Sequence, residues 1–334
     1  MFDHLLKEAK AHVTPELALR ILEESRSPEN ALQLFQIASE LRDRHLGRQL
    51  WWSAAIEGIL PCKLQPMCQF CSYSNLERLS NESLLKALRA LEDLGFRHLH
   101  LSGGTNPTGY DAEIVDMVSA MRSASPSMAI EVNLGPSLSR ETVRKLKHLG
   151  VHSITSSLET MNEELFRIAK PGDSLSARKA LLEACEEEGM AVRGMMLLGL
   201  GEPLSDRVNM LFYMSRFKML CHLRFSRYLP PQTNHLKLPR CSPWEMARTI
   251  GVARLIMPTI QLGLAAGNSH DDIPLWFIAG GGNQLVGAAA SRKKAAPGAV
   301  MLDDSLAIMN RMETQQQYVN GMGISIGFEC PPGA

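Results

Sequence analysis

The sequence has little of what marks a secreted, a membrane-bound or a nucleic-acid-binding protein. Seven cysteines among 334 residues are too few and too unevenly spaced for a disulfide framework, and the longest apolar runs are well short of a membrane span. The 35 basic and 35 acidic residues cancel, and no basic block suggests binding to nucleic acid. The first residues, MFDHLLKEAK, carry charges where a signal peptide needs an apolar core. We therefore expect a soluble cytoplasmic protein with neither a membrane nor a nucleic acid as partner.

Helices and short apolar strands alternate along most of the chain. Residues 1–48 are predicted to be helical, because Thr14-Pro15 and Ser27-Pro28 each place an N-cap residue before a proline at the first helical position. The predicted strands are residues 50–58, 98–102, 128–134, 151–158, 191–200, 221–228, 259–266 and 274–279. The predicted helices between them are residues 82–95, 111–123, 139–149, 175–189, 204–217 and 243–257.

Alternation that repeats to eight strands predicts an α/β fold, a (β/α)8 TIM-type barrel whose active site lies at the C-terminal ends of the strands. We divide the chain into an N-terminal helical extension over residues 1–48, the barrel over residues 49–290, and a C-terminal tail over residues 291–334 that packs on the barrel.

The strongest chemical signal is the segment Cys62-Lys-Leu-Gln-Pro-Met-Cys68-Gln-Phe-Cys71, which follows the first predicted strand. Closely spaced thiolates on one loop are typical ligands of an iron–sulfur cluster, and three of them leave one iron of a 4Fe–4S cluster open. The alternative is a structural zinc site, which needs a fourth ligand. No Cys or His follows at the usual spacing, although a distant His could supply that ligand.

Other motifs are weaker when they are taken alone. Ser102-Gly103-Gly104-Thr105 closes the second strand, where glycines let the backbone approach a ligand closely, but such a pair is more often only a turn. Asn133 fits a ligand contact about as well as a turn residue beside Gly135-Pro136. Arg178, near the start of a predicted helix, would by itself be assigned to a solvated helix face.

Together these motifs resemble the radical S-adenosylmethionine (SAM) superfamily. The cysteine loop after strand one, with Phe70 before its last cysteine, is similar to the superfamily's cluster loop, although the spacing is C-x5-C-x2-C instead of the usual C-x3-C-x2-C. The run from Ser157 to Arg178 and the Ala279–Asn283 turn look like the group of biotin synthase, HydE and methylornithine synthase (PylB). Gly199-Leu200-Gly201-Glu202 resembles part of the adenine-contacting motif.

The resemblance implies a 4Fe–4S cluster on Cys62, Cys68 and Cys71, with SAM bound beside it. The residues that it places around SAM are Phe70, Ser102, Gly103, Gly104, Thr105, Asn133, Ser157, Glu159, Arg178, Gly199 and Leu200. Arg178 would pair with the SAM carboxylate through a planar two-pronged contact that Lys could not reproduce. Thr105 stands where many members have Glu.

The cysteine spacing is the one we associate with HmdB-type enzymes, which belong to the biosynthesis of the iron-guanylylpyridinol cofactor of the iron-only hydrogenase. A carbon-skeleton rearrangement like that of methylornithine synthase is the second hypothesis, and sulfur insertion like that of biotin synthase is the third. A zinc-stabilised binding module without catalysis is the alternative from another class.

The resemblance also implies an electron donor such as ferredoxin or flavodoxin and a small-molecule substrate. We expect the substrate to be recognised by Arg227, Tyr228 and His235 after strand six and by Asn268 after strand seven. An Arg beside a Tyr suits a carboxylate or a similar anionic oxygen group.

Overall fold

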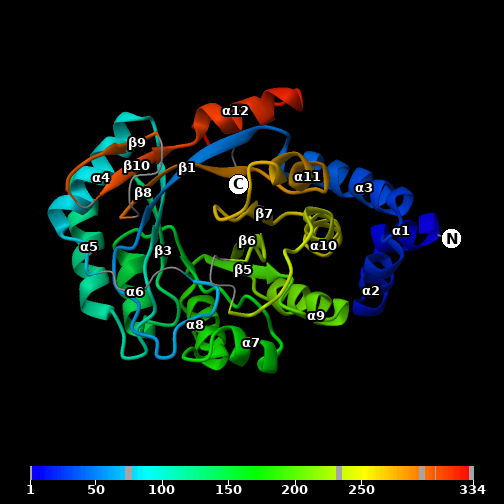
Figure 1. The fold of residues 1–334 in the computed structure, drawn as a ribbon, viewed down its shortest axis with the longest axis horizontal. Coiled ribbons are helices and arrows are strands. Elements are labelled where there is room, and N and C mark those ends of the chain that lie inside the picture. Colours follow the sequence, from blue (N-terminus) through cyan, green and yellow to red (C-terminus); the bar gives the residue numbers. More distant parts are fainter. Residues whose placement is uncertain (1, 72–76, 231–234, 293–297, 305, 331–334) are drawn as a thin grey trace.

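Three helices open the chain in the computed structural model, which describes residues 2–71, 77–230, 235–292, 298–304 and 306–330. They are α1 (Phe2–Ala11), α2 (Pro15–Glu24) and α3 (Pro28–Leu46). Both predicted caps are confirmed: Thr14 Oγ1 accepts a hydrogen bond from the Leu17 amide at 3.2 Å, and Ser27 Oγ accepts one from Asn30 at 3.3 Å. In Figure 1 these helices lie at one side of the molecule. Helix α2 packs on α9 (Leu204–Ser215) and α10 (Pro243–Ile256), and α3 packs on α10 and α11 (Asp272–Ile278).

A parallel sheet forms the centre of the molecule. Its strands are β1 (Leu50–Glu57), β2 (His98–Ser102), β3 (Ala129–Asn133), β4 (Ser153–Thr155), β5 (Val192–Leu198), β6 (Leu220–Arg227), β7 (Gln261–Leu264) and β8 (Gln284–Ser291). Their hydrogen-bonded order is β7-β6-β5-β4-β3-β2-β1-β8. Within the described ranges, β7 meets the segment before β8 through one bridge, in which Leu262 and Gly282 exchange backbone hydrogen bonds of 3.1 Å. The predicted α/β barrel class is confirmed.

Helices cover the outer face of this sheet (Figure 1). They are α4 (Asn81–Asp93), α5 (Asp111–Ala124), α6 (Arg140–His148), α7 (Glu163–Ala169), α8 (Leu175–Glu188), α9 (Leu204–Ser215) and α10 (Pro243–Ile256). All six helices expected between the strands are present, and α7 is an addition that the sequence patterns did not predict. Successive strand–helix units place the C-terminal ends of the parallel strands at one rim of the barrel, which is where such folds carry their active sites.

The predicted eighth strand was wrong. Residues 272–278 form helix α11 (Asp272–Ile278), and β8 begins only at Gln284. The apolar run PLWFIA is too short for periodicity to separate a buried helix from a strand. In the structure its Trp276 is fully buried and donates a hydrogen bond to the Leu262 carbonyl at 2.7 Å. The true strand, QLVGAAAS, is rich in small residues that have low strand propensity, which hid it.

The C-terminal tail adds to the sheet. Strand β10 (Ala307–Asn310) pairs antiparallel with β8 and with β9 (Ala299–Met301), while β11 (Ile326–Gly327) pairs parallel with the start of β1. Helix α12 (Met312–Gly321) lies between β10 and β11 and packs on α11 and β8. Near the end of the tail, the ring of Phe328 makes an edge-to-face contact with the ring of Phe96, and the two ring centroids are 5.3 Å apart.

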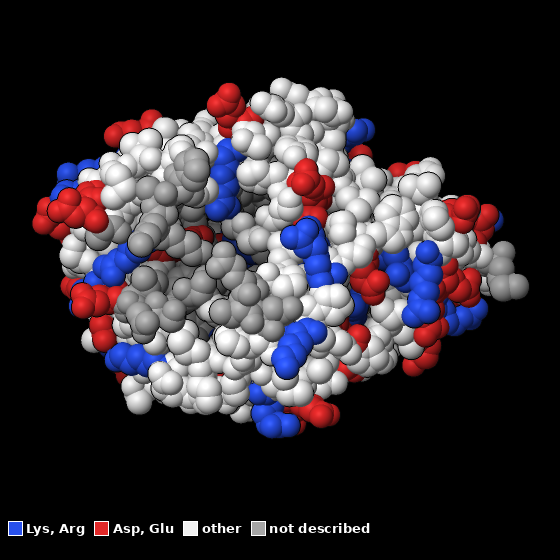
Figure 2. Space-filling view, in the orientation of Figure 1, with Lys and Arg blue, Asp and Glu red and all other residues white. Residues whose placement is uncertain are grey.

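Charged side chains of both signs are mixed on the face seen in Figure 2, which is hollowed near its centre. In the described ranges we find no helix that combines the length and the apolar character needed to cross a membrane.

Candidate active site

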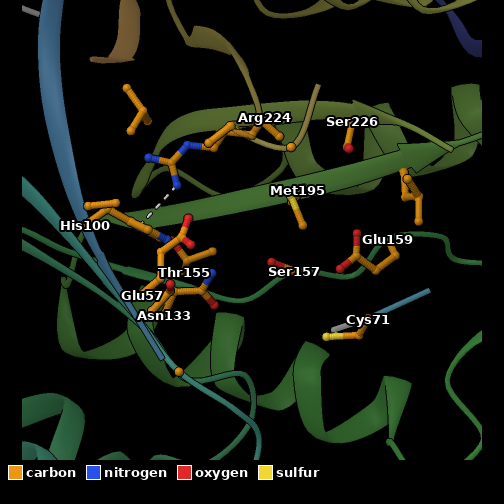
Figure 3. A pocket seen from close by; sticks show the side chains of 18 of the residues that line it. Glu57, Cys71, His100, Asn133, Thr155, Ser157, Glu159, Met195, Arg224 and Ser226 are labelled. Carbon is orange, nitrogen blue, oxygen red and sulfur yellow. Dashed lines mark hydrogen bonds between the residues drawn. The ribbon is translucent and has the colours of Figure 1, made fainter. Parts of the chain in front are cut away.

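A cavity of about 350 Å³ opens among the C-terminal ends of the strands. The residues that line it form two rings. Side chains two residues apart on a strand point the same way and are about 6.6 Å apart along the strand. Glu57, Ser102 and Asn133 are in register on β1, β2 and β3 and lie in the upper ring. Ala55 and His100 are in register one step deeper and lie in the lower ring. Figure 3 shows Glu57, His100 and Asn133 close together at the cavity.

The loop with the three cysteines is fixed to the end of β2 by backbone hydrogen bonds. The amides of Ile59, Gly104 and Lys63 donate to Ser102, Leu60 and Thr105 at 3.1, 2.9 and 2.8 Å. Gly104 packs directly on Cys62: a methyl group on Gly104 would come within 2.2 Å of the Cys62 amide nitrogen and Cα. The predicted glycine motif therefore holds the first cysteine by close backbone contact, which only glycine permits.

The other side of the loop rests on the segment after α7. The Gln69 amide donates to the Ala169 carbonyl at 2.8 Å, and Gly172 lies so close to Pro66 that an added methyl would stand 2.2 Å from the Pro66 carbonyl oxygen. Phe70 and Cys71 line the cavity. In the part of the chain that the structure describes, no three Cys, His, Asp or Glu side chains lie close enough together to form a metal-binding set.

Burial keeps the second cysteine protonated. It raises the pKa of the Cys68 thiol to about 12, although the nearby Lys170 ammonium acts in the opposite direction. A thiol with such a pKa becomes a thiolate ligand at neutral pH only when a bound cation replaces the proton. A cluster that assembled on this loop would therefore release protons.

Beside the loop lies a buried cluster of four charged groups, Glu159, Lys170, Asp173 and Arg178. Arg178 donates from Nε and Nη2 to Asp173 Oδ2 at 2.9 and 2.6 Å, and from Nη1 to the Ser157 carbonyl at 2.8 Å. Its Nη2 also reaches Thr105 Oγ1 at 3.3 Å. These bonds use four of the five N–H donors of the guanidinium. Arg178 is thus buried and not on a solvated helix face.

Glu159 is the member of this cluster that lines the cavity. Its φ of 64° is in the left-handed region, where a non-glycine residue is unusual. Its Oε1 lies 3.8 Å from Lys170 Nζ, and its Oε2 is buried without a hydrogen-bond partner among the described residues. Burial raises the pKa of this carboxyl above its ordinary value, although Lys170 and Arg178 act against the rise. An unsatisfied buried acceptor at a cavity wall is a natural contact for a polar ligand.

Residues 62–214 match the family model described as the radical SAM superfamily. Residues 62–214 of this chain are a radical SAM domain. An uncharacterised protein of Methanocaldococcus jannaschii is 30% identical over 244 residues, which span 69% of this chain and 63% of that protein. The 3-methylornithine synthase of Methanosarcina acetivorans is 24% identical over 249 residues, or 72% of this chain and 69% of that enzyme. The crystal structure of methylornithine synthase (PylB) covers 96% of this chain and 97% of its own, with a TM-score of 0.77 and 21% identity, and shows the same fold.

Members of the radical SAM superfamily use a 4Fe–4S cluster and SAM, and this chain has groups that fit both. The three cysteines lie on one loop at the barrel rim, and the glycine pair brings the backbone of β2 against it. Ser102 and Asn133 line the cavity with Cys71, and so does Glu159, whose Oε2 has no hydrogen-bond partner among the described residues.

The Gly199–Glu202 motif of the radical SAM resemblance forms a tight turn after β5. Both carboxylate oxygens of Glu202 accept backbone hydrogen bonds, from Gly199 at 3.0 Å and from Leu200 at 2.8 Å, and Arg207 donates to the same carboxylate. Gly199 has a φ of 92° and packs on Cys241. Gly199 and Leu200 lie outside the cavity lining, to which this strand contributes Met195 and Leu197.

The four residues expected to recognise the substrate lie outside the cavity lining. Arg227 donates from Nε to both oxygens of the buried Asp272 at 3.0 Å, and Tyr228 is buried in the core. Asn268 donates to the carbonyls of its own loop and of Phe225, and His235 is exposed. For Arg227 the physical reason is strand alternation: Ser226 points into the barrel, so its neighbour Arg227 points outward.

Sequence reasoning missed the polar residues that line the cavity in place of those four: Glu57, His100, Thr155, Arg224 and Ser226. A signal was present, because charged and polar side chains recur at alternate positions inside otherwise apolar strands, as in His98-Leu-His100 and His222-Leu-Arg224.

Below the cavity, Glu131 joins a buried network. Arg224 binds it end-on, from Nη1 to Oε1 at 2.7 Å and from Nη2 to Oε2 at 2.8 Å, and Arg193 Nη1 lies 3.1 Å from Oε2. Thr155 donates to Oε1 at 2.6 Å, and His100 Nδ1 lies 2.7 Å from the same oxygen. Burial alone would raise the pKa of Glu131, but the two guanidiniums hold it well below its ordinary value. The barrel centre thus contains an ionised carboxylate between two arginines.

Proposed function

We propose that the chain is an enzyme that cleaves SAM reductively and acts on a small molecule in the barrel cavity. The observation that carries this proposal is the placement of the cysteine loop: Cys71, Phe70 and Glu159 line the same cavity at the C-terminal strand ends. When bound, the cluster and SAM supply a one-electron cleavage that yields a 5′-deoxyadenosyl radical able to take a hydrogen atom from the substrate. A redox protein such as ferredoxin or flavodoxin would deliver the electron.

The chain's own residues orient the reactants and exclude water. Cys62, Cys68 and Cys71 hold the cluster, and the Gly103-Gly104 pair sets the distance between the loop and β2. Glu159 offers an acceptor at the cavity wall. Because these groups sit on strand ends, their positions are fixed before the substrate enters.

Anaerobic reconstitution tests the proposal. The loaded protein should contain about four irons with matching sulfide and, after reduction, form 5′-deoxyadenosine from SAM. Cys62→Ala, Cys68→Ala and Cys71→Ala should abolish both properties. Cys185→Ala is the matched control, because Cys185 is buried in α8 away from the loop. A protein that binds one zinc without sulfide would show the zinc-stabilised module instead.

For the pathway, we propose a small-molecule precursor of the iron-guanylylpyridinol cofactor as the substrate. Support for this finer role comes from the C-x5-C-x2-C spacing of the cysteine loop. The test is mass spectrometry of products formed with cell extracts as the source of substrate. A product that carries the pyridinol ring or its precursor is the expected result, and a product without it would remove this role.

A carbon-skeleton rearrangement of an amino acid is the second candidate. It is favoured by the similarity to the 3-methylornithine synthase of M. acetivorans, which is 24% identical over 249 residues. Rearrangement conserves atoms, so the product would have the same mass as the amino acid consumed. Incubation with single amino acids, followed by chromatography for a new isomer, separates this candidate from the first.

A further inference from the structure

The lower ring of the cavity, formed by Ala55, His100, Thr155, Met195 and Arg224, lies one strand step below Ser102, Asn133 and Ser157. In Figure 3 Arg224 approaches His100 from the opposite side of the cavity, and its Nη1 lies 3.4 Å from His100 Nδ1. A molecule bound below Ser102, Asn133 and Ser157, which the radical SAM resemblance places around SAM, would contact the side chains of the lower ring.

Arg224 is held in a way that leaves one edge of its guanidinium available. Glu131 takes the end-on edge, with one N–H from Nη1 and one from Nη2. A guanidinium has five N–H donors, and the second Nη1–H is on the side of His100, whose Nδ1 lies 3.4 Å from Nη1. The Nε–H and the second Nη2–H therefore remain as a parallel side-on pair. No described residue accepts a hydrogen bond from Arg224 Nε. The charges also favour an anionic ligand here, because the single carboxylate of Glu131 is shared by two guanidiniums, those of Arg193 and Arg224.

We propose that the lower ring is a subsite for a carboxylate of the substrate, bound by the Nε–Nη2 edge of Arg224. Two parallel N–H donors match the two oxygens of a carboxylate. Glu131 acts as a positioning residue, because its bidentate contact fixes the plane of the guanidinium before the ligand arrives. Glu57, which is in register with Ser102 in the upper ring, lines the same cavity and would face an ammonium or hydroxyl group of the same molecule.

This inference rests on the proposed function only for the identity of the ligand as substrate. The subsite itself accepts a small carboxylic acid of any source. Three acids separate the sources: L-norvaline as an amino acid, 2-oxovalerate as an oxo acid and benzoate as an aromatic acid. Each is compared with its own carboxamide, which has a similar shape but lacks the charge.

The experiment is calorimetric titration of the cluster-loaded, unreduced protein in the presence of SAM with each acid and amide. At least one acid should bind about tenfold or more tightly than its amide, since a desolvated charge pair is involved. Arg224→Gln should remove this preference, and Arg224→Lys should restore only part of it, because an ammonium cannot bind both oxygens in parallel. Arg122→Gln is the matched control, because Arg122 lies outside the cavity lining and donates hydrogen bonds to the Leu149 and Gly150 carbonyls.

Equal binding of acids and amides by the wild type, binding of none of them, or a preference that survives in Arg224→Gln would overturn the subsite. A separate assay, formation of 5′-deoxyadenosine from SAM in the absence of substrate, distinguishes a failure of the subsite from a failure of the proposed function. If SAM is cleaved but no acid is preferred, the subsite fails alone. If acids are preferred through Arg224 but SAM is never cleaved, the proposed function fails and the subsite stands.

Discussion

Gly104 and Cys62 are in direct backbone contact, with space for no atom between them. A methyl group on Gly104 would lie 2.2 Å from the Cys62 amide nitrogen and 2.5 Å from its Cβ. Real side chains do not approach backbone so closely, so the cysteine loop or the end of β2 would have to move. The glycine motif and the cysteine motif, which are 42 positions apart in the sequence, form one structural unit.

Gly104→Ala should therefore impair cluster assembly. We expect it to lower the free energy of unfolding of the cluster-free protein by about 1–3 kcal/mol, the usual range for overpacking, and to lower iron content. Gly321→Ala is the control, because Gly321 ends α12 with no atom within 4 Å of an added methyl. Iron analysis and thermal unfolding measure both effects. Full iron content in Gly104→Ala would show that the loop can shift without losing its function.

Glu159 should make stability depend on pH. Its folded-state pKa is raised by burial, so the native state binds this proton more tightly than the unfolded state does. The free energy of unfolding should fall as pH rises from the ordinary value of 4.5 through the raised value, and should stay lower above it. Glu159→Gln should remove this slope and be more stable than the wild type at neutral pH.

Denaturant unfolding of the cluster-free protein across this pH range is the measurement for Glu159. A less stable Glu159→Gln at neutral pH would mean that the contact with Lys170, 3.8 Å away, outweighs the cost of burial. Binding of SAM should weaken in the same variant if Glu159 contacts the ligand.

The parts of the fold that the sequence predicts are those with local signals. Proline after an N-cap residue locates α2 and α3, and the cysteine and glycine motifs locate the rim of the barrel. The predictions failed where a decisive contact is distant in sequence. Trp276 is helical because α11 closes over β7 through the hydrogen bond to Leu262, and nothing within PLWFIA reveals that partner.

The candidate substrate residues show the same limit in another form. Arg227 and Arg224 lie on one strand three positions apart, so they point to opposite faces of the sheet. His100 and Glu131 are in register on β2 and β3, and only the folded barrel shows that Arg224 of β6 contacts both from across its interior. If the alternation along a strand is assigned one residue out of step, a residue that points outward is mistaken for one that lines the cavity.

Arg178 should contribute to stability as well as to SAM binding. Arg178→Ala should lower the free energy of unfolding by about 3–5 kcal/mol, because among the described residues it leaves the buried Asp173 carboxylate with Lys170, 3.2 Å away, as its remaining ion-pair partner. If Arg178 also binds the SAM carboxylate, the variant should bind SAM about 2–5 kcal/mol less tightly. Arg178→Lys keeps a charge beside Asp173 but loses the planar contact. Restored stability together with an unaltered SAM dissociation constant in Arg178→Lys would assign this residue to the fold alone.

The last prediction is that iron saturates near four per chain, with no second cluster inside the barrel. A cluster needs several thiolates, and the remaining cysteines are dispersed. Cys185 is buried in α8, and Cys241 packs on Gly199. Cys221 and Cys330 line one small cavity of about 20 Å³ with His98, at the far end of the strands from the cysteine loop. Iron and sulfide titration should therefore give the same endpoint for the wild type and for Cys221→Ala/Cys330→Ala. An endpoint near six or eight irons that falls in the double variant would reveal a second cluster and reopen sulfur insertion as the reaction.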